Sequence, residues 1–191
     1  MTKKHVRFIC EKYLSTLELL LNDLIANEEE LNFKLEDIEF TLGEKTLATC
    51  VFKFNNLKLK SDSFPKHVKI VTESKLPNLE KSANKIISIE EQNRYKLKFF
   101  KLIPGTTTNY AFLVFGSNPN KIKNLRKNIS SQIKIMKDKN VVNLEKRIND
   151  HIKKMSEKSL SLENLNINYD SSQESYIAAL TLQTSLQKEI I

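Results

Sequence analysis

Glycine and proline are scarce in this sequence, which has 3 glycines and 4 prolines among 191 residues. A sandwich or barrel of many short strands normally uses more of these turn residues. The scarcity therefore argues against a fold made only of short strands and tight turns.

Long uncharged apolar segments are also missing. No stretch approaches the roughly 18 apolar residues that a membrane-spanning helix needs. Near the start, Arg7, Glu11 and Lys12 interrupt any apolar run of signal-peptide length. The sequence therefore predicts an intracellular protein, cytoplasmic or nuclear, with no membrane span.

The residues that usually form catalytic, metal or cofactor sites are sparse. The two cysteines, Cys10 and Cys50, are too few for a disulfide framework, and their apolar neighbours predict that both are buried. The three histidines lie far apart and the three glycines stand alone, so neither a metal motif nor a phosphate-binding loop is present. We therefore expect no cofactor, no metal and no enzymatic activity. These local patterns leave open a catalytic group assembled from distant residues.

The first segment with a clear periodicity is residues 3–31, which predicts a helix. Apolar residues alternate at spacings of four and three, which places them on one face of a helix. These residues are Val6, Cys10, Tyr13, Leu17, Leu20 and Leu24.

From residue 33 to residue 115 the apolar period shortens to two, which is typical of strands. A hairpin is expected around Gly43, and Pro104-Gly105 indicates a second turn. The segment 109–115 is apolar on both faces and is the best candidate for a central strand. Residues 75–89 leave the type of structure open. The strands are expected at 33–42, 46–60, 67–72, 95–103 and 109–115.

After residue 116 the apolar spacing is again that of a helix. It predicts either one long helix or an antiparallel helix pair over 119–158, because the spacing is interrupted at 137–140. Residues 159–170 resemble a linker, and a last helix is expected at 172–190. The predicted protein is α+β: an N-terminal helix on a mostly antiparallel sheet of about five strands, then long basic C-terminal helices. Its domains would be 1–116 and a helical extension, 117–191.

The positive charge is concentrated in this second part. The whole chain carries a net charge of +8, and residues 117–158 hold 12 basic and 4 acidic residues. These cations could be the solvated face of an amphipathic helix, or they could contact the phosphates of a nucleic acid. The possible phosphate contacts are Lys123, Arg126, Lys127, Lys134 and Arg147.

A helix over 119–158 would be about 60 Å long, whereas a compact protein of this size measures about 35–40 Å. Its apolar stripe would then need cover from another molecule. We therefore expect a non-catalytic subunit or adaptor of a multiprotein assembly, with no small-molecule substrate and with other subunits or a second copy as partners. A nucleic-acid-associated accessory factor is the alternative. The predicted partner-binding residues are Ile122, Leu125, Ile129, Ile133, Ile148, Ile152 and Met155.

Overall fold

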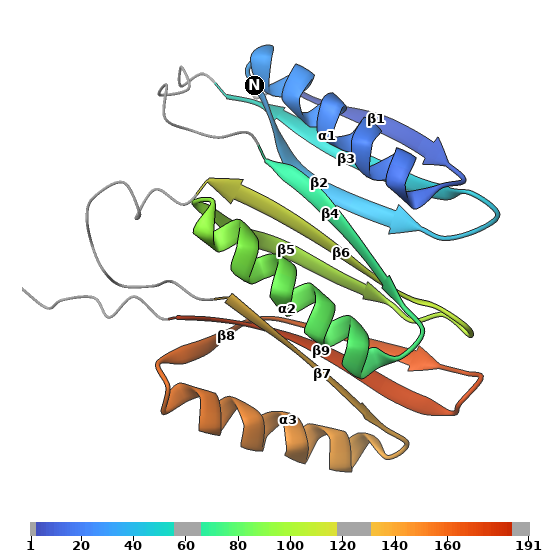
Figure 1. Ribbon diagram of the computed structural model, residues 1–191, viewed down its shortest axis with the longest axis vertical. Helices are drawn as coiled ribbons and strands as arrows, with labels where there is room; N and C mark the ends of the chain where they lie inside the picture. The colour runs from blue at the N-terminus through green and yellow to red at the C-terminus, as the bar shows by residue number, and fades with distance from the viewer. Residues whose placement is uncertain (1–2, 56–65, 118–130, 185–191) are drawn as a thin grey trace, which may run out of the picture.

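The computed structural model describes residues 3–55, 66–117 and 131–184, and within them one unit of secondary structure occurs three times. Each unit is a strand, a helix and two further strands (Figure 1). Repeat 1 contains β1 Lys4–Glu11, α1 Leu14–Glu30, β2 Phe33–Thr41 and β3 Thr46–Phe54. Repeat 2 contains β4 His67–Glu73, α2 Leu76–Gln92, β5 Tyr95–Ile103 and β6 Asn109–Ser117. Repeat 3 contains β7 Ser131–Asp138, α3 Val141–Ser156, β8 Leu160–Asp170 and β9 Ser175–Thr184.

Each repeat forms its own antiparallel three-stranded sheet with the last strand in the middle. The strand orders are β1-β3-β2, β4-β6-β5 and β7-β9-β8, so the first strand of every repeat lies at a sheet edge. The second strand has a register shift at the same point in all three repeats, around Glu36, Lys98 and Glu163. A bulge kept at one position in each unit supports a true structural repeat rather than a chance similarity of topology.

The predicted fold class is wrong in its arrangement. We expected one sheet of about five strands followed by long basic C-terminal helices. The described residues instead contain nine strands in three sheets, and each of the three helices lies inside a repeat. The division into domains at residue 116 stays a prediction, and that boundary falls between repeats 2 and 3.

Strands replace part of two predicted helices and the described part of the third. The helix expected at 3–31 begins only at Leu14, because the residues before it form β1. The helix expected over 119–158 is divided between β7 and α3, and residues 118–130 lie outside the described part. The expected linker and last helix are the paired strands β8 and β9. Strands occur at all five places predicted between residues 33 and 115, although residues 56–60 of the second prediction lie outside the described part. As predicted, β6 is the buried central strand of its sheet.

The scarcity of glycine did not correctly predict the strand content, because residues other than glycine form the junctions between helices and strands. Asn32, Arg94 and Ser159 occupy the same place, directly before the strand that follows each helix, and have φ values of 65°, 68° and 61°. This left-handed conformation costs an ordinary L-residue roughly 1–2 kcal/mol, and asparagine tolerates it best. A chain of many strands can therefore form here with few glycines.

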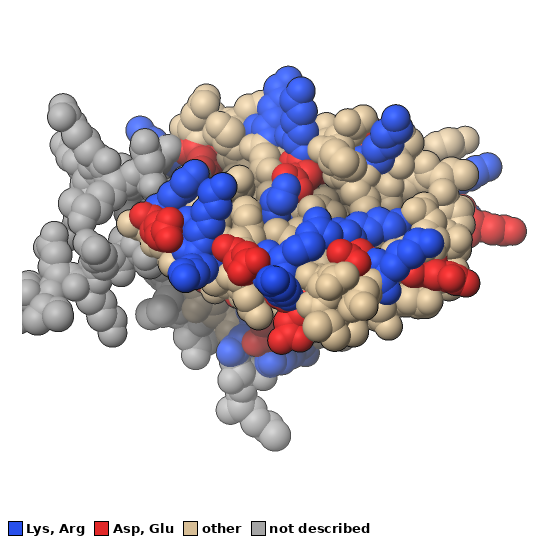
Figure 2. Space-filling model, turned by 90° about the horizontal axis from the view of Figure 1, so that it is seen from below, with Lys and Arg blue, Asp and Glu red and all other residues tan. Residues whose placement is uncertain are grey.

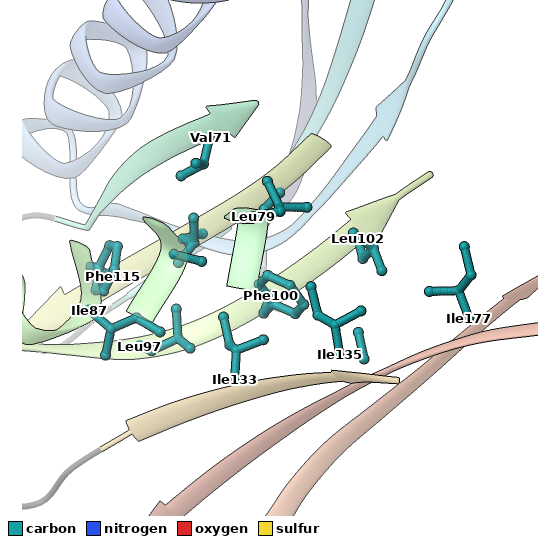
Figure 3. Packing of buried hydrophobic residues seen from close by; sticks show 14 residues of the cluster. Val71, Leu79, Ile87, Leu97, Phe100, Leu102, Phe115, Ile133, Ile135 and Ile177 are labelled. Carbon is teal, nitrogen blue, oxygen red and sulfur yellow. The ribbon is translucent and has the colours of Figure 1, made fainter. Parts of the chain in front are cut away.

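The repeats stack on one another, from repeat 1 at the top of Figure 1 to α3 at the bottom. One core joins repeats 1 and 2, where α1 and the inner face of the first sheet meet residues of the second sheet, among them Val68, Phe112 and Val114. A second core joins repeats 2 and 3 in the same way, with Ile133 and Ile135 of β7 entering it (Figure 3). In each core the helix and the following sheet together cover the preceding sheet.

The two cysteines differ in exposure, which corrects the expectation that both are buried. Cys50 is buried in the core of repeat 1, whereas Cys10 is exposed on β1. Burial raises the pKa of the Cys50 thiol to about 12, so almost none of it is the reactive thiolate near neutral pH.

We expect iodoacetamide at pH 8 to alkylate Cys10 in the dilute native protein and to alkylate Cys50 at least about 100-fold more slowly. Peptide mapping by mass spectrometry over a time course measures both rates. In denaturant both cysteines should react. Equal rates in the native protein would contradict the burial of Cys50.

Candidate protein-binding face

Two polar side chains of α1 bind the backbone of the next repeat. The amide of Asn22 accepts a hydrogen bond from the Val68 N–H at 2.6 Å and donates one to the Val68 carbonyl at 3.1 Å. One turn earlier, the carboxylate of Glu18 accepts from the Ile70 N–H at 2.8 Å. The same carboxylate lies 3.3 Å from the ammonium of Lys69. Glu18 and Asn22 therefore hold the free edge of β4 against α1.

The helix of repeat 2 makes the same contacts with repeat 3. Asn84 bonds to both the N–H and the carbonyl of Ile133, each at 2.8 Å. Glu80 accepts from the Ile135 N–H at 2.7 Å and lies 2.9 Å from the ammonium of Lys134. Glutamate and asparagine are the fifth and ninth residues of both helices. We call this arrangement the Glu/Asn pair.

The Glu/Asn pair supplies hydrogen-bond partners to an edge strand that is buried between two repeats. Backbone N–H and C=O groups at a sheet edge need partners when they are buried, and no neighbouring strand supplies them here. Residues four apart lie on one face of a helix, so the two side chains reach along the strand together. A glutamate at the sixteenth helix position adds a third bond: Glu29 accepts from the Lys66 N–H at 3.2 Å and Glu91 from the Ser131 N–H at 2.6 Å.

The third helix carries the same pair with nothing bound to it in the described residues. Glu145 and Asn149 are the fifth and ninth residues of α3, and both are exposed. No described residue hydrogen-bonds to either side chain, since no strand of the described chain follows repeat 3. The sixteenth position departs from the pattern, because Ser156 replaces glutamate and its hydroxyl donates to the Lys153 carbonyl. Two of the three strand-binding side chains are therefore present on α3.

The apolar side of β8 is uncovered as well. Leu162, Leu165 and Ile167 take the places that Leu97, Phe100 and Leu102 have in β5, counted from the start of each helix. The three β5 side chains are at most 2% exposed, whereas the three in β8 are between 37% and 52% exposed. The core of repeat 3 contains residues of α3, β7 and β9, but none of β8. We call Glu145, Asn149 and these three residues of β8 the open face.

Figure 2 shows the molecule from the α3 end. Lysine and arginine side chains cross this surface, with acidic groups and uncharged areas between them. The surface is therefore of mixed charge over the part that the structure describes, rather than uniformly basic.

The first repeat is open at the opposite end of the stack. Val6 and Phe8 on β1 are 48% and 66% exposed, whereas Val68, which takes the place of Val6 in β4, is fully buried. The Lys3 carbonyl accepts from the Phe54 N–H, so odd-numbered residues of β1 pair with β3. The backbone groups of Val6 and Phe8 consequently point to the outer edge of the sheet, because they alternate with those that pair.

The structure places the predicted partner-binding residues away from a common helical stripe. Ile122, Leu125 and Ile129 lie outside the described residues. Ile133 is buried in the core between repeats 2 and 3. On α3, Ile148 and Met155 are buried and Ile152 is partly buried. A partner-binding role for these residues stays a prediction, but the strand β7 interrupts the single overhanging helix on which it rested.

The cations predicted to contact nucleic acid are likewise not gathered on one helix. Lys123, Arg126 and Lys127 lie outside the described residues. Lys134 is paired with Glu80, and Arg147 lies 3.0 Å from the carboxylate of Asp138. Two of the five cations are thus already bound to carboxylates of the chain.

Repeats 1 and 2 each contain a histidine–glutamate pair at the same place. His67 lies 3.0 Å from Glu90, and His5 lies 2.9 Å from Glu28 at the equivalent place in repeat 1. Burial lowers the pKa of His67, while Glu90 acts in the opposite direction. Each imidazole also stacks on a buried phenylalanine, Phe115 or Phe52. Because both repeats share the arrangement, it favours a structural role in each unit.

The described residues contain no group of three or more His, Cys, Asp or Glu side chains placed to hold a metal ion. No helix in the described ranges is long and apolar enough to cross a membrane.

Sequence reasoning missed the Glu/Asn pair, although a signal was present. The pattern Leu-Glu-x-x-x-Asn occurs three times, ending at Asn22, Asn84 and Asn149. Its leucines are all buried, and each precedes the glutamate of the pair. A search for internal repeats with a period of about 60 residues would have found it.

Comparison of the chain with protein-family models, with curated proteins and with solved structures gives no significant match.

Proposed function

We propose that this protein is a non-catalytic intracellular subunit of a multiprotein assembly, and that the open face binds a partner protein. One observation carries the proposal: a surface that the next repeat covers in repeats 1 and 2 is left uncovered in repeat 3 by the residues that the structure describes. Terminal units of stacked repeat proteins usually have polar outer surfaces. Repeat 3 instead keeps apolar residues on β8 and two of the strand-binding side chains on α3.

The contacts of α1 and α2 indicate what the partner offers. Both helices bind an edge strand through two backbone N–H groups two residues apart, with a lysine between them that reaches the glutamate. We therefore expect the partner of α3 to present an open edge strand with a cation at this position. The sheet behind that strand should supply apolar side chains for Leu162, Leu165 and Ile167, since burying such residues favours association.

The proposal can be tested with tagged full-length protein expressed in its own cells and sedimented on a gradient. The wild-type chain should migrate well above the size of a monomer. Leu165→Asp and the double variant Glu145→Ala/Asn149→Ala should both shift it to the monomer position, because each removes part of the open face.

Leu19→Asp is the matched control, since Leu19 is an exposed leucine on α1 and lies outside the open face. It should migrate like the wild type. Circular dichroism of the purified variants checks that each is folded. A wild-type protein that migrates as a monomer, or open-face variants that migrate like the wild type, would refute the proposal.

A further inference from the structure

We infer that the partner of the open face is a second copy of this chain, whose β1 lies on α3 as β4 lies on α1 and β7 on α2. This inference rests on the proposed function and specifies its partner. The two ends of the stack are complementary: among the described residues, no strand follows repeat 3 to bind α3, and no helix precedes the edge strand β1 of repeat 1.

The strand β1 has the features of the strands that the Glu/Asn pair already binds. Aligned by the start of each helix, Val6 corresponds to Val68 and Ile133, whose N–H and carbonyl groups bind asparagine. Phe8 corresponds to Ile70 and Ile135, whose N–H groups bind glutamate.

A cation also stands at the matching place in β1. Arg7 corresponds to Lys69 and Lys134, the lysines that pair with Glu18 and Glu80. Within its own chain the Nε of Arg7 donates to Glu28 at 2.8 Å, and its side chain is half exposed. A guanidinium has five N–H donors in a fork, so Arg7 retains donors for the Glu145 of another copy.

Placed like β4 on α1, the β1 strand of one copy lies along the α3 helix of the other. Asn149 then bonds to both backbone groups of Val6, and Glu145 accepts from the Phe8 N–H and meets Arg7. The side chains of Val6 and Phe8, exposed in the single chain, turn toward the bare face of the third sheet. There they cover Leu162, Leu165 and Ile167, as Val68 and its neighbours cover the first sheet.

This contact joins two different surfaces, so it is heterologous. Each added copy presents a fresh open face, and such contacts produce a ring when the rotation closes and a filament when it does not. The contact does not require the two copies to be related by a twofold axis.

The test uses purified full-length protein with no other component. Mass photometry and light scattering should show species larger than the monomer that increase with protein concentration. Phe8→Asp removes the strand side of the contact, and Glu145→Ala/Asn149→Ala removes the helix side. Each variant alone should bind at least about 100-fold more weakly than the wild type, because buried hydrogen-bond or apolar partners are lost.

Mixing the two variants separates this arrangement from any symmetric one. The Phe8→Asp copy keeps an intact α3, and the Glu145→Ala/Asn149→Ala copy keeps an intact β1. Together they should form a 1:1 complex that grows no further. Leu19→Asp should associate like the wild type. A mixture that stays monomeric, or single variants that associate like the wild type, overturns the inference.

The sedimentation experiment in cells distinguishes a failure of this inference from a failure of the proposed function. If the purified wild type is monomeric at every concentration but the cellular assembly still depends on Glu145 and Asn149, the partner is another protein. The inference of a second copy then fails, while the proposed function stands. If neither self-association nor a cellular assembly is found, both fail.

Discussion

Replacing Asn84 with alanine is expected to lower the free energy of unfolding by about 2–4 kcal/mol. The substitution leaves both the N–H and the carbonyl of Ile133 without the partners that now lie 2.8 Å away. Ile133 is fully buried, and a buried backbone group without a partner costs about 1–3 kcal/mol. Urea unfolding followed by circular dichroism measures the change. The stability of Asn84→Asp should fall between those of the wild type and Asn84→Ala, because aspartate keeps the hydrogen-bond acceptor but loses the donor.

The chain supplies a matched control for this variant. Asn149→Ala is the same substitution at the same helix position, on a surface exposed to water in the single chain. In a dilute monomer it should change stability by no more than about 0.5 kcal/mol, as is usual for surface positions. Similar losses for both variants would mean that the bonds of Asn84 to β7 contribute little to stability.

Replacing Phe112 with alanine should cost about 3–5 kcal/mol, which is the usual range for a phenylalanine removed from a core. The ring is fully buried between repeats 1 and 2. It stacks on Phe40 of the first repeat, with ring centroids 3.9 Å apart. Truncation therefore opens a cavity at the contact between two repeats, where neither sheet can easily move in to fill it.

The unfolding midpoint in urea measures this loss, with Phe8→Ala as the control. Phe8 is 66% exposed, so its truncation in a dilute monomer should cost less than about 1 kcal/mol. A Phe112→Ala variant that unfolds at the wild-type midpoint would mean that repeats 1 and 2 do not pack as described.

The sequence was sufficient to predict those strands that have one buried face and one face exposed to solvent. The hairpin of β2 and β3 has alternating burial, which is the pattern that a period of two reports. The central strand β6 was also predictable, because its continuous apolar run has the length of a strand rather than of a helix.

The strands of repeat 3 were not predictable by the same means. In β7, Ile133 and Met136 are three residues apart and indicate a helix, although Ile133 and Ile135 alternate into one core. The middle strand β9 is buried on both faces, so it has no alternation that could be recognised. In β8 the apolar residues Leu162, Leu165 and Ile167 are exposed within the described part of the chain, so burial and hydrophobicity do not agree there.

The candidate site could not be predicted from periodicity at all. Glu145 and Asn149 are ordinary polar residues on the exposed side of a helix, and nothing in their local sequence indicates binding. Their significance comes only from comparison with Glu18 and Asn22, and with Glu80 and Asn84, whose partners lie more than 40 residues away in the sequence. Three-dimensional equivalence between repeats therefore carries information that a single-pass scan for motifs does not.

Because α1 and α2 each bind the first strand of the following unit, a unit added by tandem duplication in the gene would find an existing attachment site. The new unit would need no new contact, since Glu145 and Asn149 are already present on α3 and the strand edge that they would bind is copied with the unit. In the arrangement that we infer, a longer polypeptide and an assembly of separate copies would have the same contact between successive units. Gene duplication could then replace self-association without changing the chemistry of that contact.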